Sequence, residues 1–228
     1  MNVNIRCRPA YALAYISLAY GEKVYVERSS MATMSGGMDL RTGFGGEGVA
    51  RALKRRYLGG ETLLFNECVA EIEGAWIAVA PRYPGDVDVV EVSAEHEWLI
   101  EAGSLMAYSE GINSDVRFSG LRTMVMHEGI TLIEVAGQGQ ALISSYGGIE
   151  EITLGPSEQL IVDTGHIVAF SKTLQFDVGP LGSFRTAVLS GEGLVAMFTG
   201  PGRILIQTRA EEPFRQWLFP DQFQNTGH

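Results

Sequence analysis

The sequence has few cysteines and no long hydrophobic run. Cys7 and Cys68 are the only cysteines in 228 residues. Two cysteines are too few for a disulfide scaffold or a cysteine-rich zinc site, and we expect a protein of the reducing cytoplasm. No segment approaches the roughly 18 apolar residues of a membrane-spanning helix. Arg6 and Arg8 precede an apolar stretch at 10–20, as in a signal peptide. Its tyrosines and the missing cleavage motif favour a first strand instead.

Basic residues and catalytic motifs are also scarce. The chain has 17 Lys and Arg against 27 Asp and Glu, for a net charge of −10. A surface of this charge repels phosphate backbones, so we expect no nucleic acid partner. Glycines at 43, 45 and 48 match the spacing of a dinucleotide-binding loop. No alternation of strands and helices surrounds them, and we interpret the segment as a glycine loop.

Glycine, in contrast, is abundant. The chain has 28 glycines, scattered between short apolar runs, and 46% of its residues are hydrophobic while 19% are charged. The composition is that of a globular protein, and glycine turns between short apolar runs are typical of strands. The sequence therefore predicts an all-β fold.

An internal repeat is the strongest pattern in the sequence. Three segments each begin with an acid, pass two small or polar residues and enter an apolar run; the acids are Glu27, Glu101 and Asp163. A second block, an acid before a strand-like segment that a glycine turn closes, recurs in the same order; its acids are Glu61, Glu128 and Glu192. We expect the acids of the second block to cap backbone N–H groups, with ligand binding as the alternative. One unit cannot bury both faces of its sheet, so we predict three β-units that pack with pseudo-threefold symmetry.

The repeat divides the chain into units and a C-terminal helix within a single domain. The predicted segments are units at about 10–92, 93–154 and 155–210, a helix at 211–218, and a loose tail at 221–228. Glu211 and Glu212 suit the positive end of that helix, and Pro213 suits its first turn. Phe214 and Trp217 are expected to cover one mouth of the assembly.

The first unit carries an insert at 41–60 that the other units lack. Its centre has the periodicity of a short helix, and four basic residues gather on it: Arg51, Lys54, Arg55 and Arg56. Basic charge on one helix of an acidic protein suits an anionic membrane surface or an acidic protein partner. The alternative is a solvated face that pairs with the protein's own carboxylates.

A family resemblance rests on segments spread over nearly the whole chain. They are Gly60-Glu61, Pro84-Gly-Asp86, Glu101-Ala-Gly103, Tyr146-Gly-Gly-Ile149, Val162 to Phe170, Ser190 to Leu194, Gly200-Pro-Gly202 and Gln207-Thr-Arg209. With these segments the chain resembles the AIM family, named for altered inheritance of mitochondria. The resemblance implies three fused units similar to the trp RNA-binding attenuation protein, each a short double-stranded β-helix. It implies no catalytic residues, and RNA binding does not transfer with a fold.

Three hypotheses about function follow. The first is a non-enzymatic scaffold or interaction protein, active at a membrane surface in one version, with no cofactor. The second is a small-ligand or ion-binding module that uses the pseudo-threefold axis or the mouth near the 41–60 insert. The third is a metal-dependent enzyme on a β-helix scaffold, although His127 and His166 fall in different units and lack the spacing of a cupin metal site. We also expect a homo-oligomer, because closed β-units still leave short edge strands and the apolar strands near both termini are rich in aromatic residues.

Overall fold

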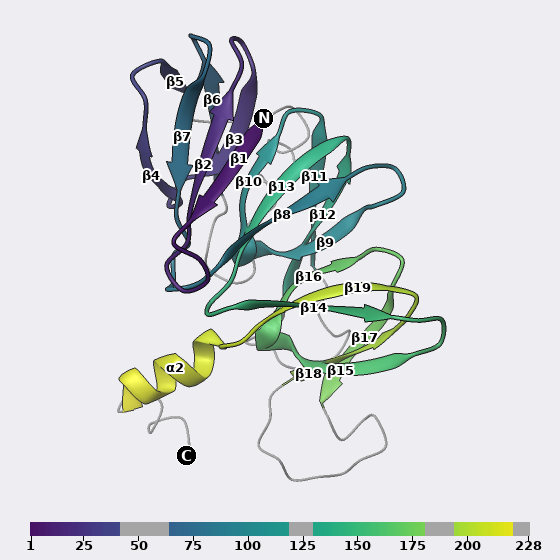
Figure 1. Ribbon diagram of the computed structural model, residues 1–228. Coiled ribbons are helices and arrows are strands. Elements are labelled where there is room, and N and C mark those ends of the chain that lie inside the picture. The colour runs from purple at the N-terminus through teal and green to yellow at the C-terminus, as the bar shows by residue number, and fades with distance from the viewer. Residues whose placement is uncertain (42–63, 119–129, 181–193, 221–228) are drawn as a thin grey trace.

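The structure is a computed structural model that describes residues 1–41, 64–118, 130–180 and 194–220 (Figure 1). Within these ranges the chain is mostly β, with strands β1 to β19, two short 3-10 turns and one α-helix. The prediction of an all-β protein is therefore confirmed.

The strands follow one another in three groups along the chain. The first group is β1 (Asn2–Arg6), β2 (Leu13–Leu18), β3 (Lys23–Glu27), β4 (Met31–Met34), β5 (Met38–Arg41), β6 (Phe65–Ala70) and β7 (Ala75–Val79). The second group is β8 (Val87–Val92), β9 (Trp98–Glu101), η1 (Ala102–Ser104), β10 (Leu105–Ser109), β11 (Ile112–Phe118), β12 (Thr131–Gly137) and β13 (Gly139–Ser144). The third group is β14 (Ile149–Leu154), β15 (Gln159–Asp163), η2 (Thr164–His166), β16 (Ile167–Ser171), β17 (Gln175–Pro180), β18 (Leu194–Thr199) and β19 (Gly202–Gln207), and α2 (Glu211–Leu218) follows it.

Side-chain patterns explain which strands are covered on one face and which on both. In β2, Ala14, Ile16 and Leu18 are buried, whereas the residues between them are partly exposed. This alternation is that of a strand with one face on the core. In β10 and β16 four consecutive residues are buried, so these two strands are covered on both faces.

The three groups share one pattern of antiparallel pairing. In each group the last strand lies between the first and the third of six, as β13 lies between β8 and β10. The fifth strand lies between the second and the fourth, as β12 lies between β9 and β11. The same neighbours occur around β7 and β6 in the first group, where β1 is an added strand beside β2, and around β19 and β18 in the third.

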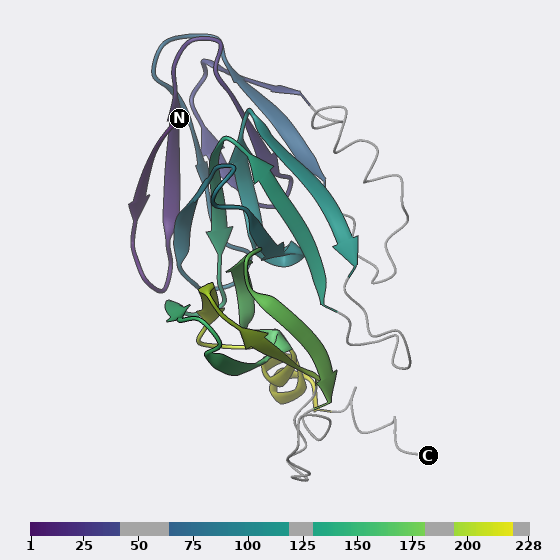
Figure 2. The same cartoon turned by 90° about the vertical axis from the view of Figure 1, so that its right-hand side faces the viewer.

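Successive groups are joined by shared sheets. β3 pairs with β10 and gives a six-stranded sheet in the order β5-β6-β3-β10-β13-β8. β9 pairs with β16 in the same way and gives the order β11-β12-β9-β16-β19-β14. A four-stranded sheet, β1-β2-β7-β4, and a three-stranded sheet, β15-β18-β17, lie at the two ends. In Figure 1 the first group is at the top, the third at the bottom, and α2 projects beside the third. Figure 2 shows the same succession of groups from the side.

Buried side chains form three hydrophobic clusters that cross the junctions between groups. The central cluster joins Tyr25 and Phe65 of the first group to Tyr108 of the second, whose ring stacks on that of Tyr25 at 5.0 Å and meets Phe65 edge-on at 5.1 Å. A further cluster surrounds Phe170 and Phe198, which lie 4.9 Å apart in the third group. Burial of such aromatic side chains is a main stabilising term of the fold.

The C-terminal helix lies where the sequence predicts it, but its surroundings differ. Residues 211–218 form α2, with Glu211 and Glu212 in the first turn. None of its residues is buried, and Trp217 is 74% exposed. Among the described residues, the helix therefore does not bury Phe214 and Trp217 as a cover over the mouth of an assembly would.

Two finer predictions concern the boundaries of the units and their symmetry. Pairing places β8 with the second group and β14 with the third, whereas the boundaries at 92 and 154 put each of these strands in the preceding unit. The repeated acids end the second strand of each group, so the sequence has no marker for the first strand. The pseudo-threefold symmetry and the double-stranded β-helix unit stay predictions.

Candidate functional site

Three turns that are distant in the sequence meet beside the C-terminal helix. Gly147 donates from its backbone N–H to the carbonyl of Pro84 at 3.0 Å, and Asp86 donates back to the carbonyl of Gly147 at 2.9 Å. Arg209 donates to the carbonyl of Tyr146 at 3.2 Å, and Thr208 donates to that of Gly148 at 3.0 Å. Each turn leads into or out of a group of strands, so the convergence fixes where the three groups meet.

Two glycines permit this close approach. A Cβ on Gly85 would lie 1.7 Å from the carbonyl oxygen of Ser145, so a side chain cannot be accommodated without a backbone shift. Gly147 has a φ of +80°, which residues with a side chain rarely adopt, and a Cβ there would lie 2.4 Å from Oγ1 of Thr208. The backbones can meet only because both positions are glycine.

An ion pair anchors the convergence to the N-terminal segment. Arg8 donates from Nε and Nη2 to the two carboxylate oxygens of Asp86 at 2.8 and 2.9 Å, in a bidentate contact. Asp86 is buried and also accepts the backbone N–H of Val87 at 2.9 Å. The carboxylate raises the pKa of the Arg8 guanidinium, chiefly through the hydrogen bond. Loss of Arg8 would leave a buried charge with too few partners.

A row of four aromatic rings extends from these turns onto the helix. The ring of Tyr146 lies 5.4 Å from that of Tyr83 and 5.5 Å from that of Phe214, and Phe214 lies 5.9 Å from Trp217 in a stacked arrangement. We call these four side chains the aromatic row. Tyr83 and Tyr146 are half-buried, whereas Trp217 extends into solvent.

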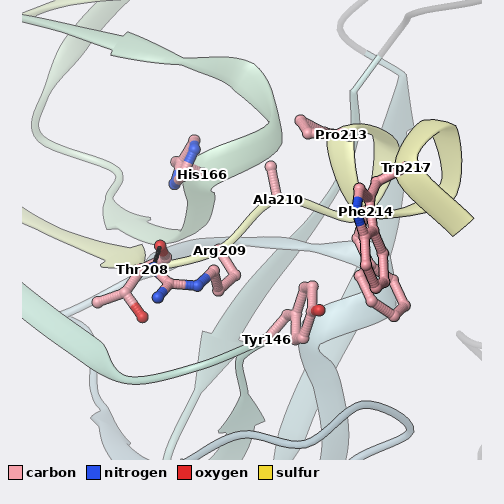
Figure 3. A pocket seen from close by; sticks show the side chains of 8 residues that line it. All are labelled: Tyr146, His166, Thr208, Arg209, Ala210, Pro213, Phe214 and Trp217. Carbon is pink, nitrogen blue, oxygen red and sulfur yellow. Dashed lines mark hydrogen bonds between the residues drawn. The ribbon is translucent and has the colours of Figure 1, made fainter.

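A shallow hollow lies against the aromatic row (Figure 3). Its volume is about 390 Å³, and it is lined by Tyr146, His166, Thr208, Arg209, Ala210, Pro213, Phe214 and Trp217. Figure 3 shows the aromatic side chains on one side of the hollow and His166 on the opposite side, with Arg209 between them. The lining therefore combines a broad apolar wall with one cation.

Gln207 organises the polar side of the hollow. Its side-chain oxygen accepts the N–H of Tyr146 at 2.8 Å, and its Nε2 donates to the carbonyl of Gly165 at 2.8 Å. Nδ1 of His166 lies 2.7 Å from the carbonyl oxygen of Gln207. A carbonyl can only accept, so Nδ1 donates and Nε2 of the neutral ring remains an acceptor. The hollow thus offers apolar contact, a guanidinium and one imidazole acceptor.

The acids of the first repeated block lie apart, and each holds its own turn. Each carboxylate accepts the N–H of the second residue after it: Glu27 from Ser29 at 2.9 Å, Asp163 from Gly165 at 2.8 Å, and Glu101 from Gly103. Glu27 and Glu101 also accept the hydroxyls of Ser30 and Ser104. His166 stands at the position of Ser30 and Ser104 in its turn. These contacts are structural, and the structure does not bring the three acids together.

Burial has an electrostatic consequence at Glu101. Removal from water raises the pKa of its carboxyl group, while hydrogen bonds from Gly103 and Ser104 oppose that rise. The charge of Glu211, in the first turn of α2, adds to the increase. The start of the helix and the turn of the second group are therefore electrostatically linked.

Other candidate residues lie outside the part of the chain that the structure describes. They are the basic residues of the insert, Arg51, Lys54, Arg55 and Arg56, and the acids of the second repeated block, Glu61, Glu128 and Glu192. Within the described ranges, no three His, Cys, Asp or Glu side chains come together as a metal site would require. In those same ranges no helix has the length and apolar character that crossing a lipid bilayer demands.

Sequence reasoning missed the convergence although it had singled out its parts. The segments at 84–86, 146–149 and 207–209 all contributed to the family resemblance, but nothing in the sequence indicated that they meet. Tyr146 and the side chain of Gln207 are 61 residues apart in the chain. Because each segment ends a strand or begins one, only the pairing of strands brings them together.

Comparison with known proteins identifies relatives over nearly the whole chain. The family model described as Mitochondrial biogenesis AIM24 matches residues 3–209. The uncharacterized protein M6_Spy0233 of Streptococcus pyogenes serotype M6 is 26% identical over 211 residues, which cover 90% of this chain and 84% of that protein. The X-ray crystal structure of protein SPYM3_0169 from Streptococcus pyogenes superposes with a TM-score of 0.77 at 26% identity and covers 96% of this chain and 99% of that one. The chain therefore belongs to the AIM24 family.

Proposed function

We propose that the protein is a non-enzymatic scaffold or interaction protein, and that it binds a protein partner through the aromatic row and the hollow beside it. The observation that carries the proposal is the exposure of Trp217 next to the ring of Phe214 at the end of that row. Leu218 and Phe219 continue the exposed apolar surface. Contiguous apolar side chains on a polar surface are typical of binding sites.

The location of these side chains supports binding rather than packing. None of the helix residues is buried, so the apolar residues of α2 add little to the core. The turns beneath them are held by backbone hydrogen bonds and by the buried pair of Arg8 and Asp86. A rigid base with an exposed aromatic anchor is the arrangement of an interaction hot spot.

Charge indicates which partner suits this surface. Glu211 and Glu212 lie at the start of α2, and the chain as a whole carries a net charge of −10. Arg209 provides a single cation within the hollow. A partner segment with an apolar side chain for the hollow and basic residues beside it would complement this surface.

The repeated pairing supports the finer prediction about the fold. Three groups with the same strand neighbours, and with a bulge at the same place in β4, β10 and β16, are what three copies of one unit would give. We include in the proposal that the groups are attenuation-protein-like units, each related to the next by the same step, in an array that stays open at β4 and β15 in the described structure.

Affinity capture with matched variants tests the proposed function. Trp217→Ala removes the exposed anchor, and Tyr20→Ala removes an aromatic side chain of equal exposure, 73% against 74%, at a distant turn. We expect a protein captured from native extract by the wild type and by Tyr20→Ala to be depleted about tenfold or more with Trp217→Ala, since truncation of a hot-spot residue costs about 2 kcal/mol. Binding by purified components must reproduce the difference. Equal capture by both variants would contradict the proposal.

A small ligand in the hollow is a second candidate. The combination of Arg209, the imidazole acceptor of His166 and the aromatic wall suits an aromatic or apolar molecule with an anionic group. A thermal-shift screen of such compounds tests it, because a ligand at 100 times its Kd adds about 2.7 kcal/mol of stability. The shift must disappear with Arg209→Ala for the hollow to be the binding site.

The membrane version of the scaffold proposal rests on the sequence of the insert. Its four basic residues, Arg51, Lys54, Arg55 and Arg56, would each contribute about 1 kcal/mol near an anionic lipid surface. Reversal of the four charges to Glu is expected to abolish binding to anionic vesicles and to leave the melting temperature nearly unchanged. A wild-type protein that ignores such vesicles at low salt would remove this version.

A further inference from the structure

The two ends of the strand array carry complementary edges. Inside the chain, the second strand of one group always pairs with the third strand of the next, as β3 pairs with β10 and β9 with β16. Two strands therefore lack the partner that this rule would give them. They are β4, the third strand of the first group when the added strand β1 is not counted, and β15, the second strand of the last group. Within the described residues, β4 and β15 each lie at the edge of their sheet.

The leftover strands keep the local form of their paired counterparts. β4 has a register shift between Met31 and Thr33 against its neighbour, and β10 and β16 have the same shift between Leu105 and Ala107 and between Ile167 and Ala169. The Glu or Asp that ends β3, β9 and β15 holds the following turn in the same way. The edge of β4 therefore has the shape that fits a second strand of the β15 type.

Exposure distinguishes the ends from the internal junctions. Met34, directly after the bulge of β4, corresponds to Tyr108 in β10 and Phe170 in β16. Ile161, two residues before the acid that ends β15, corresponds to Tyr25 in β3 and Leu99 in β9. The four residues at internal junctions are at most 9% exposed, whereas Met34 is 37% and Ile161 is 47% exposed. The residues that face each other at the internal junctions therefore have apolar, partly exposed counterparts at the two ends.

Within the part of the chain that the structure describes, the two edges also lack the usual protection against pairing. Edge strands are commonly blunted by charged side chains or proline. β4 has the sequence Met-Ala-Thr-Met, and the only charged residue of β15 is Asp163, which is occupied by the N–H of Gly165. Both edges therefore remain competent to add a strand.

We infer that a second copy of this chain adds its β15 to β4, in the antiparallel register of the internal junctions. Ala107 faces Val26 and Ala169 faces Ile100, so Thr33 would face Val162 and Met34 would face Ile161 of the partner copy. The joined sheet would have the order β17-β18-β15-β4-β7-β2, with β1 beyond it, and so would match the two internal six-stranded sheets.

Geometry favours a second copy over closure within one chain. β4 lies in the group at the top of Figure 1 and β15 in the group at the bottom, and Figure 2 shows the same separation of the two groups. No pairing joins these two strands in the described structure. Because the two edges differ, the contact is head-to-tail, and repeated contacts give a ring or a filament rather than a two-fold dimer. This inference does not depend on the helix surface proposed above.

Engineered cysteines test the contact and its direction. Two variants, Met34→Cys and Ile161→Cys, are made in a Cys7→Ser background because Cys7 is exposed, whereas Cys68 is buried. Under mild oxidation we expect a disulfide-linked dimer when the two variants are mixed, and far less in either variant alone. A mixture of Met34→Cys with Ile72→Cys, another exposed apolar position, serves as the control.

Mass in solution provides the second measurement. Analytical ultracentrifugation of the wild type should show species larger than one chain that grow with concentration, and Met34→Lys should weaken the association at least about tenfold, because it places an uncompensated charge at the contact. Ile72→Lys should leave it unchanged. A wild type that is monomeric throughout, association that survives Met34→Lys, or cross-linking as strong within single variants as in the mixture would each overturn the inference.

Discussion

The residue that follows the β-bulge in β10 lies at an internal junction, whereas its counterpart in β4 lies at a free edge, so its replacement by alanine should destabilise the fold by different amounts. Tyr108 and Met34 occupy the same position in two groups, but Tyr108 packs between Tyr25 and Phe65 and is buried, whereas Met34 lies at the outer edge. Tyr108→Ala removes a buried aromatic side chain, which costs about 3 to 5 kcal/mol, and also two ring contacts, at about 0.5 to 1.5 kcal/mol each. Met34 is 37% exposed, so Met34→Ala removes less buried surface and should cost about 1 kcal/mol at most in dilute solution.

Thermal and guanidinium unfolding followed by tryptophan fluorescence measure this difference. For a chain of this size each kcal/mol lowers the melting temperature by about 2 to 4 °C, so Tyr108→Ala should melt about 10 °C below the wild type. Far-UV circular dichroism confirms that both variants remain folded before heating. If Tyr108→Ala cost less than about 1 kcal/mol, or if Met34→Ala cost as much at low concentration, the view of Tyr108 as part of an internal junction would be wrong.

Three further predictions concern single residues. Because burial raises the pKa of Glu101 in the folded state, stability falls as pH rises from the ordinary carboxyl pKa to the raised one. Glu101→Gln should therefore become more favourable relative to wild type across that window, and a stability difference between the two proteins that does not change with pH would contradict this. Gly85→Ala should lower the melting temperature strongly, since its Cβ would meet a backbone oxygen at 1.7 Å; an unchanged melting curve would refute the close contact. Burial raises the pKa of Cys68 to about 11, so a thiol reagent should modify exposed Cys7 in the native protein and Cys68 only after unfolding, and fast native labelling of both would be inconsistent with this.

The repeated acids predicted that the fold has three similar groups of strands, but not that successive groups share a sheet. Glu27, Glu101 and Asp163 are visible in the sequence because each must hold the same turn through its N–H groups. The sequence shows which residues end a strand, but pairing across groups depends on which edges remain unprotected. The pairing of β3 with β10 is therefore visible only in the three-dimensional structure.

The candidate site was predictable only in pieces. Pro213 and the two preceding acids indicated α2 from sequence, because helix starts have strong local preferences. The exposure of Trp217 could not be predicted, because an apolar stripe on a short helix normally faces a core. The contact of Tyr146 with Gln207 depends on long-range pairing and left no local pattern.

Amide hydrogen exchange at the outer edges tests the assembly of the chain through shared sheets most directly. Exchange is followed for β4 and β15 over a range of protein concentrations, with β10 and β9 as internal references that are already paired. We predict that amides of β4 and β15 gain protection together as concentration rises, that Met34→Lys abolishes the gain in both strands, and that the references do not change. Protection of β4 and β15 that is independent of concentration, or a gain confined to one of them, would contradict the account.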